Sequence, residues 1–122
     1  MNFHEPLPEK CPPAEASDQP LEGIYRLLTT EEATEESFAS HIALGKEPYP
    51  TVCPCIQSAC SLVYDPKKYK LLPRLKDHKW AAKLSIPKGA GLSLTTKNKN
   101  HVSFWRSQGF DIVSSVLEVV EI

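Results

Sequence analysis

The sequence has no long hydrophobic run and no recognisable leader. No apolar stretch approaches the roughly 18 residues that a membrane-spanning helix needs. The N-terminal segment, MNFHEPLPEK, contains no basic stretch followed by an apolar one. These absences argue against a membrane-spanning helix and a secretory signal. We therefore expect a cytoplasmic protein without a membrane partner.

Catalytic and cofactor motifs are also missing. The sequence contains no glycine-rich phosphate loop, no G-x-S-x-G or H-E-x-x-H motif and no paired-carboxylate signature. It also has no internal repeat and no heptad pattern. No enzyme class is indicated by a motif, and the residues by themselves predict no cofactor.

The spacing of the cysteines is unusual for a metal site. The four cysteines are Cys11, Cys53, Cys55 and Cys60. They could form two disulfides, but nothing in the sequence indicates an oxidising compartment, so free thiols are expected. Cys53, Cys55 and Cys60 are weak candidates for zinc ligands, because zinc sites usually pair cysteines as C-x2-C and a fourth ligand would have to come from His41, His78 or Cys11. Buried, small hydrophobic side chains are the favoured interpretation.

Length and composition fit one small globular domain. The chain has 122 residues, of which 41% are hydrophobic and 24% are charged, which suits a single core. Residues 1–20 hold five of the eleven prolines. Since proline lacks a backbone donor and fixes φ, this segment is expected to be an irregular arm. Residues 21–122 are expected to form one α+β domain.

Runs of β-branched, aromatic and alternating apolar residues predict a small, mostly antiparallel sheet of about five or six short strands. The runs lie at 23–28, 59–64, 80–86, 92–96, 101–105 and 116–122. Two or three short helices are expected between them. One would run from an N-cap at Thr34 to Gly45, one from Asp65 and Pro66 to residues 71–72, and a single turn would be capped by Asp111.

The charges are divided unevenly along the chain. Residues 1–60 carry ten acidic and three basic side chains, whereas residues 61–106 carry eleven basic and two acidic ones. Either the two halves neutralise each other in the fold, or the basic half faces an acidic or phosphate-bearing partner. Its densest part contains Lys67, Lys68, Lys70, Arg74, Lys76, His78, Lys79 and Lys83. Tyr69 and Trp80 lie within it and would let single-stranded nucleic acid stack, although most such runs are solvated surfaces.

His101, Ser103 and Trp105 alternate with Val102 and Phe104. In a strand, the first three share one face, and the apolar pair points to the core from the other. The polar face would suit a small molecule or a stacked base, because histidine can donate, accept or transfer a proton near neutral pH. The favoured alternative is that Trp105 covers the sheet edge and His101 is a solvated turn residue.

Arg26 follows Tyr25 within an otherwise apolar strand. A buried arginine needs a carboxylate or phosphate partner. Glu118 or Glu121 on the last strand could be that partner. Arg26 could equally bind the phosphate of a ligand.

A resemblance is carried by Tyr25-Arg26 on the first strand, by Cys60-Ser61-Leu62-Val63 on a middle strand followed by a helix, and by His101 to Trp105 near the end. Their order resembles the layout of small bacterial domains of uncharacterised function, and it is similar to a shortened ADP-ribosyltransferase-like fold. That resemblance implies that Arg26 holds NAD, that Ser61 supports the nicotinamide pocket, and that Glu118 or Glu121 acts on the ribose.

The sequence predicts a non-catalytic interaction module that binds a protein or anionic partner through a basic and aromatic surface. The expected surface consists of Tyr69, Arg74, Lys76, Lys79, Trp80, His101, Ser103 and Trp105. An alternative is a small NAD-dependent ADP-ribosyltransferase-like enzyme whose catalytic residues are Arg26, Ser61, His101, Glu118 and Glu121. A second alternative is single-stranded nucleic-acid binding.

Overall fold

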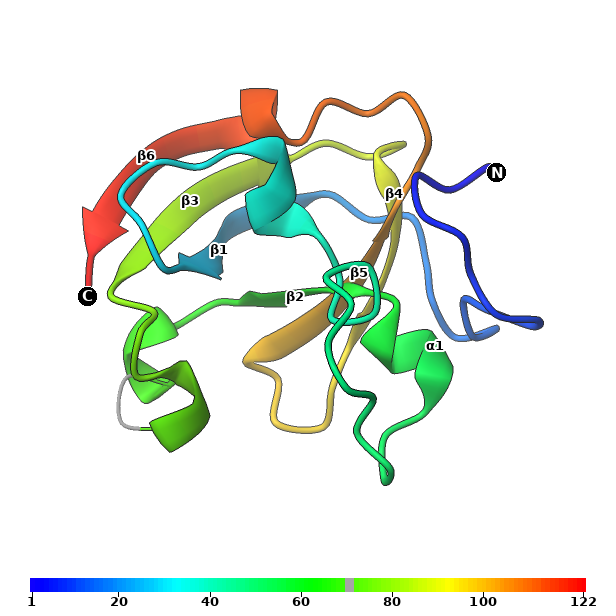
Figure 1. Cartoon of the computed structure of the whole chain (residues 1–122). Helices are drawn as coiled ribbons and strands as arrows, with labels where there is room; N and C mark the ends of the chain where they lie inside the picture. The colour runs from blue at the N-terminus through cyan, green and yellow to red at the C-terminus, as the bar shows by residue number, and fades with distance from the viewer. Residues whose placement is uncertain (70–71) are drawn as a thin grey trace.

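The computed structural model describes residues 1–69 and 72–122. It contains a six-stranded antiparallel sheet with the strand order β4-β5-β2-β1-β3-β6 (Figure 1). The strands are β1 (Leu21–Leu28), β2 (Cys60–Val63), β3 (Trp80–Ile86), β4 (Gly91–Thr95), β5 (His101–Arg106) and β6 (Val116–Glu121). Each lies where the sequence predicts a strand, so the antiparallel sheet is confirmed.

The two longer predicted helices are wrong in length, whereas the single turn predicted after Asp111 is present as a 3-10 turn. The described part of the chain has one α-helical turn, α1 (Pro54–Gln57), and short 3-10 turns, η1 (Glu35–Phe38), η2 (Pro66–Tyr69), η3 (Pro73–Leu75) and η4 (Val113–Ser115). The fold is therefore mostly sheet, rather than α+β with two or three helices. Residues 70 and 71, where the helix predicted from Asp65 would end, lie outside the described residues, and so does Lys70 of the basic run. Within the described ranges, no helix is long and apolar enough to span a membrane.

Tertiary contacts end the turn η1. Ala39, directly after it, has an extended backbone with φ −68° and ψ 145°. The Arg26 guanidinium donates to the carbonyls of Ser37 and Ala39, which a continuing helix would use for its own hydrogen bonds. The backbone N–H and the hydroxyl of Ser40 donate to the Glu5 carboxylate of the arm, at 3.0 and 2.6 Å. Long-range partners therefore override the local helix propensity of this segment.

The main core lies against one face of the sheet. Its strand residues are buried and alternate along the inner strands, and they include Ile24, Leu62, Ala82, Leu84, Val102 and Phe104. Phe38 of η1 and Ile112 before η4 cover them from outside the sheet. Val102 and Phe104 thus point into the core, as the alternation in β5 predicts.

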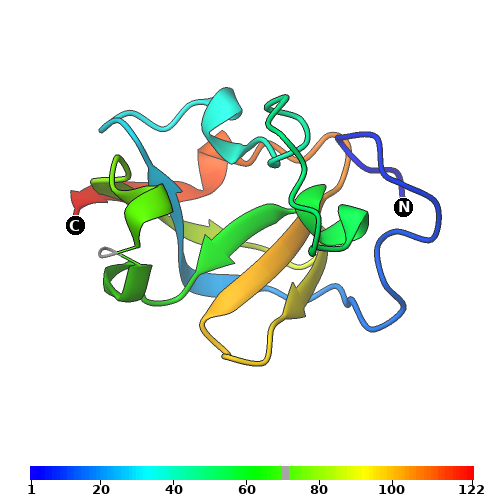
Figure 2. The same ribbon diagram turned by 60° about the horizontal axis from the view of Figure 1, so that its bottom comes forward.

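A smaller cluster lies on the opposite face, around Trp105, which is only 1% exposed. Residues 1–20, the arm, and the turn α1 cover this ring with side chains that include Phe3, Leu7, Cys11, Cys55 and Ala59. The arm passes the edge of the sheet at β4, where Ser17 pairs with Ser93 in an isolated bridge (Figure 2). The proline-rich segment is therefore packed on the domain through a few specific contacts.

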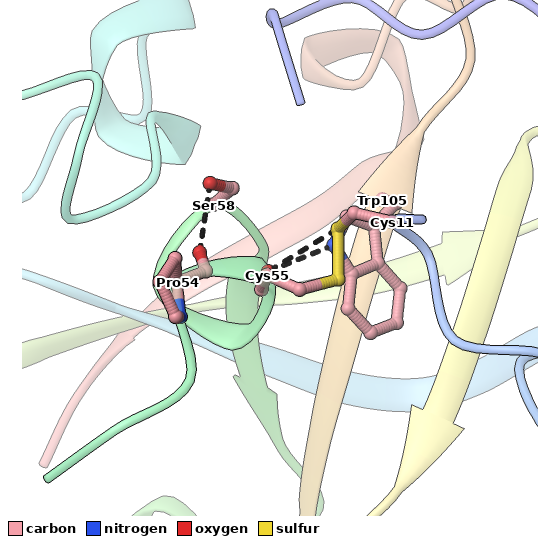
Figure 3. The surroundings of a disulfide bond; sticks show 5 residues. All are labelled: Cys11, Pro54, Cys55, Ser58 and Trp105. Atoms are coloured by element: carbon pink, nitrogen blue, oxygen red, sulfur yellow. Dashed lines mark hydrogen bonds between the residues drawn. A yellow bond between two sulfur atoms is a disulfide. The ribbon is translucent and has the colours of Figure 1, made fainter. Parts of the chain in front are cut away.

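A disulfide joins the arm to α1. Cys11 and Cys55 are bonded, with a Cα–Cα distance of 5.4 Å and a sequence separation of 44 (Figure 3). Beside this bond, the indole Nε1–H of Trp105 donates to the Cys55 carbonyl at 3.1 Å. The expectation of free thiols is therefore wrong for Cys11 and Cys55, whereas the exposed Cys53 and the buried Cys60 are free. No local pattern indicates this pairing, because only the course of the arm over the sheet brings the two cysteines together.

Candidate functional site

Backbone pairing is sparse between the two central strands, β1 and β2. They share one register pair, Tyr25 with Val63, whereas β1 and β3 share seven. Beyond that pair, the side chain of Arg26 reaches from β1 to β2, and its Nη1 donates to the Ser61 carbonyl at 3.0 Å. Arg26 therefore bridges two strands at a point where the ladder is incomplete.

Backbone carbonyls bind the guanidinium of Arg26. Its Nε donates to the Ser37 carbonyl at 2.8 Å, and its Nη2 donates to the Ala39 carbonyl at 3.0 Å. Among the described residues, no carboxylate forms a salt bridge with it. Neither Glu118 nor Glu121 pairs with it, because β6 is separated from β1 by β3. Three of the five N–H donors of its guanidinium are bound by carbonyls, none of which carries a compensating negative charge.

A pocket of about 450 Å³ lies beside Arg26. Six basic or imidazole side chains line it and define what we name the basic pocket: Arg26, His41, Lys46, Arg74, His78 and His101. Ser61 and Val63 of β2 and the ring of Tyr69 also contribute to its lining. No aspartate or glutamate is found among the described lining residues. The pocket is therefore strongly biased towards negatively charged ligands.

The loop between Ser40 and α1 forms one wall of the basic pocket. The buried side-chain amide of Gln57 accepts from the Tyr49 backbone N–H at 2.8 Å and donates to the carbonyls of Tyr49 and Val52, at 3.1 and 2.8 Å. The His41 ring stacks on the Tyr49 ring, with centroids 4.3 Å apart and planes 21° from parallel. His41 Nε2 also lies 2.7 Å from the Glu47 carbonyl. These contacts hold Tyr49 in place from both its backbone and its ring.

Two of the pocket histidines, His78 and His101, favour their neutral forms. The pKa of His78 lies below its ordinary value of 6.5, because burial and then the charges of Arg26 and Lys46 disfavour the imidazolium. The pKa of His101 is lowered by burial and then by the charge of Arg74. Arg26, Lys46 and Arg74 contribute positive charge to the pocket, and the neutral imidazoles of His78 and His101 can each both donate and accept.

The structure brings together some of the residues predicted from the sequence and leaves others apart. Tyr69, Arg74 and His101 of the expected binding surface line the basic pocket, as do Arg26 and Ser61 of the transferase alternative. The other predicted residues are outside its lining, namely Lys76, Lys79, Trp80, Ser103, Trp105, Glu118 and Glu121.

Burial explains part of this separation. Trp105 and Ser103 are each 1% exposed, and the arm and α1 cover Trp105. Neither side chain is therefore accessible, contrary to the binding surface expected from the sequence. Lys76, Lys79, Glu118 and Glu121 are exposed.

Sequence reasoning missed the loop that completes the pocket. His41, Lys46, Tyr49 and Gln57 lie in or next to a proline-rich stretch without periodicity. Their convergence depends on the Gln57 amide, which bonds backbone groups five and eight residues away. The available signal was a tyrosine between two prolines, which is too common to identify a binding wall.

The cysteines do not form a ligand set. Cys55 is bonded to Cys11, and Cys60 lies in the main core, where burial raises the pKa of its thiol. Cys53 is exposed. Across residues 1–69 and 72–122, no group of three or more histidine, cysteine, aspartate or glutamate side chains is placed to hold a metal ion.

Comparisons with known proteins add no relative. The chain matches no protein-family model, no curated protein and no solved structure. The resemblance to the ADP-ribosyltransferase-like fold stays a prediction, and the chemistry of the basic pocket is the basis for a function.

Proposed function

We propose that this chain is a binding module that holds an anionic partner in the basic pocket and does not catalyse a reaction. The observation that carries this proposal is the convergence of Arg26, Lys46 and Arg74 on one pocket whose described lining has no carboxylate. Bringing like charges together is unfavourable unless an anion compensates them, and a concave site concentrates their field. The pocket volume of about 450 Å³ suits a small molecule or one acidic group of a protein partner.

Exposed apolar side chains close to the pocket add contact surface for such a partner. Leu44, Tyr49 and Val52 line the pocket and are 39%, 45% and 36% exposed. A polar pocket edged by apolar groups is typical of binding surfaces, where the charges orient the partner and the apolar edge contributes area.

A matched pair of charge variants tests this proposal. Thermal stability would be followed as inorganic phosphate or sulfate is added to the wild type, to the double variant Lys46→Gln with Arg74→Gln, and to the double variant Lys88→Gln with Lys97→Gln. Both doubles remove two positive charges, but Lys88 and Lys97 are exposed in turns outside the pocket. We expect the anion to stabilise the wild type and the second double, because ligands that bind only the folded state raise its stability. Equal anion responses in the two doubles would show that the pocket is not the site.

One observation favours the transferase alternative as a second candidate. Arg26, Ser61 and His101 line the same pocket, as an NAD site of that type requires. Glu118 and Glu121, the residues implied to act on the ribose, are exposed on the edge strand β6. An assay of NAD hydrolysis tests this candidate. Turnover that is lost in Ser61→Ala and in Glu118→Gln would favour it over the binding module.

Single-stranded nucleic acid is the remaining alternative. Lys76 and Lys79 are exposed outside the pocket and could track a phosphate backbone. Binding of an oligonucleotide with a steep salt dependence, lost in Lys76→Gln with Lys79→Gln and retained in Lys46→Gln with Arg74→Gln, would replace the pocket by this surface.

The cytoplasmic location stays a prediction. The Cys11–Cys55 disulfide favours an oxidising compartment, because the cytosol keeps most protein thiols reduced. Trapping free thiols in cells with a maleimide tests the location. Labelling of two cysteines per chain would indicate that the disulfide is formed, whereas labelling of all four would indicate a reducing compartment.

A further inference from the structure

We infer that the group bound in the basic pocket is a phosphate ester that carries a flat ring, such as a mononucleotide. This inference rests on the proposed function, since it names the ligand of the same pocket. Three features of the pocket support it: the volume of the pocket, its group of basic side chains, and the stacked rings of His41 and Tyr49.

The pocket is larger than a bare anion needs. Its volume of about 450 Å³ falls within the roughly 300–1,000 Å³ of small-molecule sites. A phosphate or a carboxylate would fill only one corner of it. The rest of the lining combines two tyrosines and several aliphatic side chains with polar ones, among them Arg74, His41 and His101, so part of the ligand beyond the phosphate is expected to be flat or apolar.

One end of the pocket is suited to a phosphate. Arg26 and Lys46 both lie close enough to His78 to lower its pKa after burial has done so. A phosphate monoester carries a charge between about −1.5 and −2 and three acceptor oxygens, which matches the positive charges of the Arg26 guanidinium and the Lys46 ammonium.

Another part of the pocket is suited to a ring. Tyr49 is 45% exposed, and its ring stacks on His41 with a centroid distance of 4.3 Å. One face of the tyrosine is thus occupied by His41, and a ligand ring could extend the stack on the other. The half-buried Tyr69 lines the same pocket. Stacking on aromatic side chains is tolerant of the kind of base or aryl ring.

The ring-binding wall is ordered before any ligand arrives. Gln57 is 5% exposed and bonds both the N–H and the carbonyl of Tyr49. Because the loop is held through its backbone, little conformational entropy remains to be lost when a ring stacks on Tyr49. A tyrosine ring that is held in place in this way can select ligands that carry a flat ring.

The test compares ligands that share the phosphate and differ in the ring. Isothermal titration at low salt would measure AMP, O-phosphotyrosine, ribose 5-phosphate, inorganic phosphate and adenosine against the wild type. We expect AMP or phosphotyrosine to bind about tenfold or more tightly than ribose 5-phosphate, since ribose 5-phosphate has no aromatic ring to stack on Tyr49. Adenosine should bind weakly, because it lacks the phosphate. The tighter of the two ring-bearing phosphates identifies the source of the ligand, a nucleotide or a modified tyrosine.

Matched tyrosine variants assign the preference to the wall. Tyr49→Ala should reduce the ratio between AMP and ribose 5-phosphate to about one, while Tyr64→Ala should leave it unchanged. Tyr64 is a fitting control because it is 40% exposed and lies outside the pocket lining. The hydrogen bonds between Gln57 and residue 49 use the backbone, so they persist in Tyr49→Ala.

The outcomes separate this inference from the proposed function. If all the phosphates bind equally well and Lys46→Gln with Arg74→Gln abolishes binding, the pocket binds anions and the ring inference is wrong. A preference for AMP that survives in Tyr49→Ala would also overturn it. If no phosphate binds to the wild type, both the ring inference and the proposed anion site are wrong.

Discussion

The two ends of strand β5 lie in different environments on the same face of the sheet. At one end, Trp105 is sealed under the arm and α1 beside the Cys11–Cys55 disulfide, and we name this region the disulfide end. At the other end, His101 lines the basic pocket. The two residues are four apart and share a face by alternation. The comparison shows that the pattern of a strand decides which residues share a face, whereas the segments that fold over it decide whether that face is core or site.

The turn α1 contributes to both regions. Cys55 bonds the arm and accepts the hydrogen bond of Trp105, while Gln57, two residues later, holds the wall of the basic pocket. A change at the disulfide end therefore reaches the pocket only if it displaces α1. Graded substitutions can separate stability, which depends on the disulfide end, from ligand affinity, which depends on the pocket.

The largest expected loss of stability comes from Trp105→Ala. Removing this buried ring should lower the free energy of unfolding by about 3–5 kcal/mol, because a cavity replaces a packed aromatic side chain. Urea unfolding would measure the loss. Trp105→Phe is the milder comparison, since it keeps much of the apolar volume and loses only the indole hydrogen bond. A loss under about 1 kcal/mol for Trp105→Ala would show that the second cluster does not stabilise the fold.

Breaking the disulfide should cost somewhat less. The variant Cys11→Ser with Cys55→Ser should lower the free energy of unfolding by about 2–4 kcal/mol, because a loop of this length is no longer closed in the unfolded chain. Cys53→Ser is the matched control, since Cys53 is an exposed free thiol. Titration of the wild type and the disulfide variant with phosphate, at a temperature where both are folded, would show whether the pocket depends on the bond. An unchanged melting temperature in the disulfide variant would contradict this account.

Gln57→Ala should affect both regions of the comparison at once. The substitution leaves the N–H of Tyr49 and the carbonyls of Tyr49 and Val52 without their partner, which should cost about 1–3 kcal/mol of stability. It should also weaken ligand binding, because the loop of Tyr49 is released. Ser58→Ala is the control within the same turn, since it removes one hydrogen bond to the Pro54 carbonyl and none to the loop (Figure 3). Equal ligand affinity in Gln57→Ala and Ser58→Ala would show that ligand binding does not depend on the hydrogen bonds between Gln57 and the loop.

The smallest expected effect is a dependence of stability on pH. Because the pKa values of His78 and His101 are lowered in the folded state, the unfolded chain binds more protons as the pH falls below about 6.5. Their contribution to stability is therefore present above pH 6.5 and is lost as the pH falls through the folded pKa values. The pKa of Glu35 is lowered by its hydrogen bond with Arg106, so its contribution is lost below pH 4.5 and does not overlap. Denaturation at several pH values should give a shallower slope in His101→Asn than in the wild type.

A bound anion should oppose this loss of stability at low pH. An anion in the basic pocket favours the imidazolium forms of both histidines, so it should bind more tightly as the pH falls from 7 to 5.5. Titrations with sulfate, whose own charge is the same at both pH values, would show whether affinity rises. An affinity that is the same at both would indicate that neither histidine contacts the anion.

The strands were predictable because their determinants are local. Alternation in residues 101–105 and the β-branched residues of 116–122 indicate strands in any context that buries one face. The turn after Asp111 was also visible, and the Asp111 carboxylate accepts from the backbone N–H of Ser114 at 3.3 Å. The helix predicted from Thr34 failed because its carbonyls are bound by Arg26, a partner that no local pattern reveals.

The candidate site was predictable only in part, for the same reason. Arg26, Tyr69, Arg74 and His101 stood out by charge or by their place in a strand, but the sequence could not show that they meet in one pocket. The burial of Trp105 depends on a disulfide that spans 44 residues. Both features arise from segments that are distant along the chain, so they require the three-dimensional fold.

The most direct measurement of the central claim is a ¹⁵N–¹H correlation spectrum recorded while AMP is added to the wild type at low salt. It reports on both ends of β5 in one experiment. The account predicts that the amides of Tyr49, Ser61 and His101 shift together with one dissociation constant, while the indole N–H of Trp105 at the disulfide end stays in place. Shifts confined to exposed lysine regions, or no shift of the pocket amides at saturating AMP, would contradict it.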